Sequence, residues 1–141
     1  MSAPEWSMAH WSDAVDRPEI VDEALDRRDR HAGVALLVLV LNHPDPAVSL
    51  PRIKRGLRAA DPQTRVNAVQ SLGHHARLHR MIDTESIALL RRARRDRTMA
   101  GGYQIRGYAH HAASDVGMFA PRRDLPRWLR RRHPGPRRTP V

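Results

Sequence analysis

The sequence predicts an all-α protein: a short stack of five to six helices arranged as antiparallel pairs. Apolar residues recur at helical spacing in several segments, and these segments are separated by short turns that begin with Asp or Asp-Pro. The one continuous apolar run has no second strand candidate to pair with. We expect an N-terminal segment at residues 1–17, a helical domain at 18–119, and a flexible basic tail at 120–141, rich in Arg and Pro.

The first two helices are predicted from different signals. Pro18 followed by Glu19 indicates a helix start, because the first turn of a helix needs no donor from proline. The apolar run at 32–41 fits a buried helix or a buried strand. A lone strand would leave its backbone groups unpaired, so we predict a helix here, the central and most buried one.

Aspartates predict the starts of the next three helices. Asp45 precedes Pro46, Asp61 precedes Pro62 sixteen positions later, and Asp83 precedes a third apolar stripe. We expect the second of these helices to run to about residue 79. Pro51 predicts either a kink or a delayed start in the first, and Gly101 and Gly102 are expected to open a last helix that ends near residue 119.

A short internal echo supports stacked helix pairs. Shifting the sequence by 36 positions aligns two sets of apolar, small and histidine residues. The first set is Val69, Leu72, Gly73, His74, His75 and Ala76. The second set is Ile105, Tyr108, Ala109, His110, His111 and Ala112. A unit of this length is typical of α-solenoids, in which each helix pair buries its apolar face against its neighbours.

Several motifs resemble those of HEAT-repeat proteins. They are His43-Pro44-Asp45-Pro46, Asp61-Pro62 with Arg65, Leu72-Gly73-His74, and Ala76-Arg77-Leu78-His79. Over residues 18–119 the chain is similar to small bacterial HEAT-like proteins, most of unassigned function and some suspected to be immunity proteins that bind a toxin. The resemblance implies a scaffold for protein partners or, less often, for nucleic acid, and only rarely an enzyme. Pro51, the Gly101-Gly102 opening and the basic tail depart from the pattern.

The formal net charge of +10 is concentrated in the tail. Residues 120–141 contain eight arginines and one acid, Asp124, so the rest of the chain carries only +3. The tail supplies Arg122, Arg123, Trp128, Arg130, Arg131 and Arg132 as candidate partner-binding residues. A second interpretation of the tail is a solubilising extension without a target.

Two basic clusters in the body complete the candidate partner-binding set. Arg52, Lys54, Arg55 and Arg58 fall on one predicted helix, and Arg91, Arg92, Arg94, Arg95 and Arg97 crowd the end of another. Because stacked pairs place equivalent helices side by side, the clusters could join into a basic strip, interrupted by Asp61, Asp83 and Asp96. Favourable charge–dipole contact at the helix end is the structural alternative.

The sequence offers no support for catalysis or a cofactor. It has no cysteine, no phosphate-binding loop and no nucleophile motif. His75 and His79 have zinc-ligand spacing, with a third ligand available from His110, His111 or Asp115, yet we expect structural or surface histidines and no metal.

We therefore expect a non-catalytic protein-binding module, an adaptor, regulator or toxin-neutralising protein, in the bacterial cytoplasm. No secretory signal is visible, and no apolar run is long enough to span a membrane. The alternative is a nucleic-acid-associated protein that contacts phosphates through the arginine strips and the tail.

Overall fold

The computed structural model describes residues 13–130, and this part of the chain is all-α apart from one small hairpin. Six helices form the body: α2 (Glu19–Asp26), α3 (Ala32–Asn42), α4 (Pro46–Leu57), α5 (Pro62–His79), α6 (Thr84–Ala93) and α7 (Ile105–Phe119). They are followed by a 3₁₀ turn, η1 (Arg122–Asp124), and a short helix, α8 (Arg127–Arg130).

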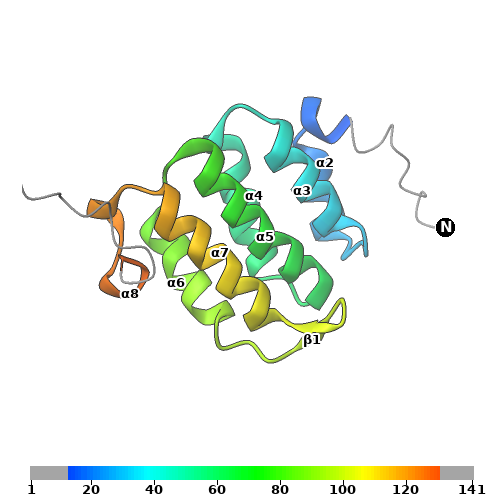
Figure 1. Ribbon diagram of the computed structural model, residues 1–141. Coiled ribbons are helices and arrows are strands. Elements are labelled where there is room, and N and C mark those ends of the chain that lie inside the picture. Colours follow the sequence, from blue (N-terminus) through cyan, green and yellow to red (C-terminus); the bar gives the residue numbers. More distant parts are fainter. Residues whose placement is uncertain (1–12, 131–141) are drawn as a thin grey trace, which may run out of the picture.

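The helices form two layers (Figure 1). One layer contains α3, α5 and α7, and α5 packs against both of the others. The second layer contains α2, α4 and α6, and α4 packs against both of the others. Each helix also packs against the next one in the chain, across the layers. This is the topology of stacked antiparallel helix pairs.

The predicted aspartate caps are confirmed. Side-chain oxygens of Asp45, Asp61 and Asp83 accept hydrogen bonds from the backbone N–H groups of Ala47, Thr64 and Ser86, at 2.9, 3.0 and 2.7 Å. Each bond satisfies one of the donors that a helix start leaves unpaired. α4 begins at Pro46 with Pro51 inside it, so the alternative of a delayed start is wrong.

The centre of the body is α5, not α3, so that prediction is wrong. α5 packs against α3, α4, α6 and α7, whereas Leu41 on α3 remains 42% exposed. The sequence pattern hid the role of α5 because its buried face includes small polar residues and a histidine, which lower its apolar character. Thr64, Ser71 and His75 are among them.

Gly101 and Gly102 form a hairpin turn, which corrects the prediction that they open the last helix. β1 (Met99–Ala100) pairs antiparallel with β2 (Tyr103–Gln104), and the two glycines between them have φ of 60° and 84°. Such left-handed values are what a two-residue hairpin turn requires. The Gly-Gly pair was therefore a hairpin signal, and α7 begins at Ile105.

The packed body also extends past residue 119, the predicted end of the helical domain. Leu125 and Leu129 are buried in the same core as the body helices, and α8 packs against α7. Two regularly spaced leucines allow this segment to cover the end of the stack despite its arginines. Residues 131–141 and 1–12 lie outside the described residues.

Candidate functional site

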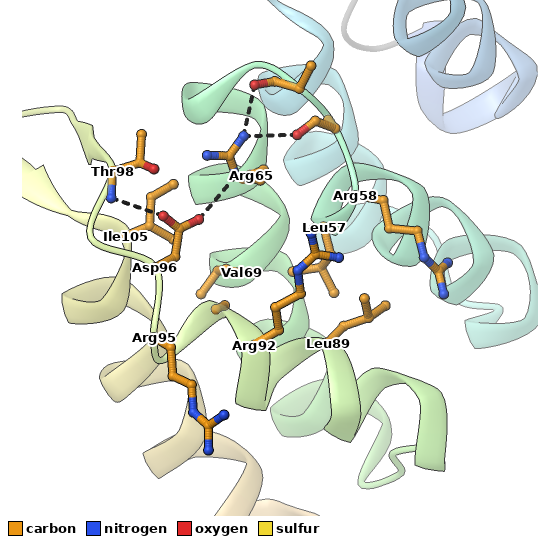
Figure 2. A pocket seen from close by; sticks show the side chains of 13 residues that line it. Leu57, Arg58, Arg65, Val69, Leu89, Arg92, Arg95, Asp96, Thr98 and Ile105 are labelled. Carbon is orange, nitrogen blue, oxygen red and sulfur yellow. Dashed lines mark hydrogen bonds and ion pairs between the residues drawn. The ribbon is translucent and has the colours of Figure 1, made fainter.

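Two open cavities lie between successive helix pairs, on the side of the molecule that carries the turns within the pairs. The larger has a volume of about 570 Å³ and lies between the α4–α5 and α6–α7 pairs (Figure 2). The smaller, of about 300 Å³, lies between the α2–α3 and α4–α5 pairs. Residues 58–60, at the α4–α5 turn, line both.

The large cavity has an apolar floor. Leu57 from α4, Val69 from α5 and Ile105 from α7 meet there, and Leu89 and Ala93 of α6 complete the lining. Val69 and Ile105 are fully buried, so the floor is continuous with the core, whereas Leu89 is half-buried. The apolar surface that a ligand can reach in this cavity therefore comes mainly from Leu89.

Arg65 holds the wall of the large cavity together (Figure 2). Its guanidinium donates to the carbonyl oxygens of Ala59 and Ala60 at 3.0 and 2.8 Å, and to a carboxylate oxygen of Asp96 at 3.3 Å. Burial alone would raise the pKa of Asp96, but hydrogen bonds from Thr98 and the charge of Arg65 outweigh this and lower it. Asp96 is thus an ionised structural partner that ties the α6–β1 loop to α5.

The basic residues of α4 are matched by acids on the neighbouring helices. Arg52 lies 2.8 Å from Asp22, and Arg55 contacts both Asp22 and Asp26. These pairs join α4 to α2, so this half of the expected basic strip is neutralised.

The other two basic residues of α4 are paired with the start of α6. Lys54 lies 2.8 Å from Asp83 and 3.0 Å from Glu85, and Arg58 also pairs with Glu85. Hydrogen bonds to the two carboxylates raise the pKa of Lys54. This pairing is not predictable from local sequence, because only the fold brings the start of α6 next to α4.

The arginines of α6 and of the turn after it differ in whether they line the large cavity. Arg92 and Arg95 line the large cavity, and no ion pair of either occurs within residues 13–130. Figure 2 shows Arg92 reaching toward Leu57 of α4, whereas Arg95 points away from the other labelled side chains. Arg91 and Arg94 line neither cavity.

The tail residues that the structure describes belong to the capping segment. The guanidinium of Arg94 lies over the ring of Trp128, 4.8 Å from its centroid, and that ring is half-buried against the core. Arg122, Arg123 and Arg130 are exposed and line neither cavity. Arg131 and Arg132 lie outside the described residues.

The histidines are not assembled around a common point. His75 and His79 stack at 5.2 Å between ring centroids, while His110 and His111 contact each other and are exposed on α7. Residues 13–130 contain no group of three or more side chains placed to hold a metal ion. A search of the same residues found no helix with the length and apolar character needed to cross a bilayer.

Arg28 is the cavity residue that sequence reasoning missed. It lines the small cavity from the α2–α3 turn, in a left-handed conformation with φ of 53°. The available signal was an arginine directly after the end of an amphipathic helix, where glycine is the favoured residue.

Comparison with known proteins found no relative of this chain. No protein-family model matches the chain, and no curated protein and no solved structure was found to be similar to it. The cavity between the α4–α5 and α6–α7 pairs, with its apolar floor and arginine rim, is therefore the candidate site on the geometry alone.

Proposed function

We propose that this protein is a non-catalytic protein-binding module, and that the large cavity receives an apolar side chain next to an acidic group of the partner. The observation that carries the proposal is Arg92, a cation without an ion-pair partner among the described residues, beside a floor of Leu57, Leu89 and Ile105. A guanidinium next to apolar surface suits a carboxylate carried on an apolar neighbour.

The balance of charges favours a protein partner over a nucleic acid. A phosphate backbone requires a row of available cations, and the α4 cations are matched by Asp22, Asp26, Asp83 and Glu85. Base stacking requires an open aromatic face, and Arg94 already covers one face of Trp128. Both features weaken the case for nucleic-acid binding through α4 and Trp128.

The stacked helix pairs agree with a scaffolding role. The resemblance to small bacterial HEAT-like proteins supports a cytoplasmic adaptor, a regulator or a toxin-neutralising protein, because such arrays present extended surfaces for partners. The partner of a toxin-neutralising protein would contribute the acidic and apolar groups that fit this cavity.

Matched charge reversals on α6 test the proposal. Arg92→Glu changes the cavity, whereas Arg91→Glu changes an exposed neighbour outside it, and both alter the last turn of the helix in the same way. We expect nuclease-treated cell extract to yield a stoichiometric protein partner with the wild type and Arg91→Glu, and a loss of roughly tenfold or more in affinity with Arg92→Glu. Equal recovery with both variants contradicts the proposal. Loss of all bound material on nuclease treatment would instead support the nucleic-acid alternative.

A further inference from the structure

We propose that the two cavities form one groove, that an extended acidic segment of a protein partner lies along it, and that Arg28 is one of its binding residues. This inference rests on the proposed function and adds the form of the ligand and a second contact point. We call the combined surface the turn-side groove; it is lined by the two cavities and joined at residues 58–60.

The two cavities of the turn-side groove are neighbours that share one wall. Arg58, Ala59 and Ala60 border the large cavity on one side and the small cavity on the other. Arg58 on this ridge is paired with Glu85, and the other two side chains are small: Ala59 is half-buried and Ala60 is exposed. A chain in extended conformation can therefore cross it and place alternate side chains in successive cavities.

The two ends of the groove each offer a cation. Arg92 lies at the large cavity and Arg28 at the small one, and no ion pair of Arg28 occurs within residues 13–130. The two aspartates that line the small cavity accept hydrogen bonds from backbone N–H groups. Asp29 accepts from the N–H of His31 at 2.8 Å, and Asp61 accepts from that of Thr64 at 3.0 Å.

The backbone of Arg28 provides an independent reason to assign it a role. The α2 helix ends in a Schellman motif, with the N–H of Asp29 bonded to the carbonyl of Ala24 at 2.9 Å and that of Arg28 bonded to the carbonyl of Leu25 at 3.1 Å. Arg28 occupies the left-handed position where glycine is unstrained. An arginine at such a position has a cost in stability that glycine would avoid, which favours a use for its side chain.

Arg80 supplies a natural control for this argument. It ends α5 with φ of 52° and lines neither cavity. Its guanidinium lies 5.7 Å from the centroid of the Phe119 ring, so the Arg80 side chain already has a contact within the protein. Within residues 13–130, these two arginines are the non-glycine residues with positive φ.

The experiment compares Arg28→Gly with Arg80→Gly in the full chain. The probe is a labelled peptide in which Glu and Leu alternate, measured by fluorescence anisotropy beside the same peptide with Gln in place of Glu. Because glycine relieves the left-handed strain, we expect Arg28→Gly to raise Tm by about 2–5 °C. Arg80→Gly should gain less, since it also loses the contact with Phe119.

Binding separates the two variants. We expect Arg28→Gly to weaken binding of the Glu-Leu peptide roughly tenfold and Arg80→Gly to leave it within about twofold of wild type. The Gln-Leu peptide should bind at least about tenfold more weakly than the Glu-Leu peptide to the wild type. Unchanged peptide affinity in Arg28→Gly, with a loss in Arg92→Glu, overturns the groove but leaves the proposed function intact. Unchanged peptide affinity in both variants overturns the groove and the proposed function. If a single-stranded oligonucleotide binds more tightly than the peptide, and the same substitutions abolish its binding, the groove binds nucleic acid instead.

Discussion

His75 shows how a single residue links the interior of the stack to pH. Its side chain is fully buried, and neither ring nitrogen has a hydrogen-bond partner among the described residues. Burial, followed by the charge of nearby His79, lowers the pKa of His75 to about 4, although Asp83 acts in the opposite direction. His75 is therefore neutral in the folded protein at neutral pH.

This pKa predicts a loss of stability in mild acid. Unfolded His75 takes up a proton near pH 6.5, whereas the folded residue does so only near 4, so the stabilisation present above pH 6.5 is lost as pH falls toward 4. The difference amounts to about 3 kcal/mol of unfolding free energy. Denaturant titrations from pH 7 to 4.5 should show most of this loss. His75→Leu should remove that dependence, and His111→Leu, at an exposed site, should retain it; an unchanged pH profile in His75→Leu contradicts the assignment.

Arg65 gives a second prediction at the residue scale. Replacing it with methionine keeps the aliphatic stem but leaves Asp96 and the carbonyls of Ala59 and Ala60 without their donor. We expect Arg65→Met to lower the unfolding free energy by about 1–3 kcal/mol, measured by urea denaturation. Arg106→Met, at an exposed position on α7, should change it by less than about 0.5 kcal/mol. Equal effects of the two substitutions would show that Arg65 does not hold the cavity wall.

Among the helices and turns, α8 has a role that depends on the rest of the fold. Leu129 is fully buried, and the short helix that carries it packs against α7 at the end of the stack. A stack of helix pairs requires such a cover, because its terminal pair has no neighbour to bury its apolar face.

Truncation of the α8 leucine tests this capping role. Leu129→Ala should destabilise the protein by about 2–4 kcal/mol in urea denaturation, through lost burial and the cavity that remains. Arg127→Ala on the exposed side of the same helix should cost less than about 0.5 kcal/mol. If Leu129→Ala is as stable as the wild type, residues 120–130 are not part of the folded body.

Prediction from sequence succeeded for elements whose signal is local. The caps at Asp45, Asp61 and Asp83 follow from short-range chemistry, and three helices begin where these residues predict. The Gly101-Gly102 pair is an equally local signal for a hairpin turn, but it was interpreted as the start of a helix. The central position of α5 was not predictable from apolar character, since it depends on which helices surround it.

The candidate site was only partly predictable, for a reason that belongs to the whole molecule. The sequence identified Arg58 and Arg92, but not that Glu85 pairs with the first and that nothing among residues 13–130 pairs with the second. Ion pairs between α2, α4 and α6 join residues about thirty positions apart, so they follow from the stacking of the pairs. The stack thus neutralises the α4 half of the expected basic strip, whereas Arg92 and Arg95 line the large cavity without an ion pair among residues 13–130.

We propose that a protein partner makes contact with the turn-side groove. The most direct test is photo-crosslinking in cells, with a photoreactive amino acid at Ala60, which borders both cavities, or at Ala47, an equally exposed position in the first turn of α4. We predict a discrete protein adduct from position 60 that disappears when Arg92→Glu is added, and none from position 47. Adducts from position 47 alone, or nucleic-acid adducts from position 60, would contradict the claim.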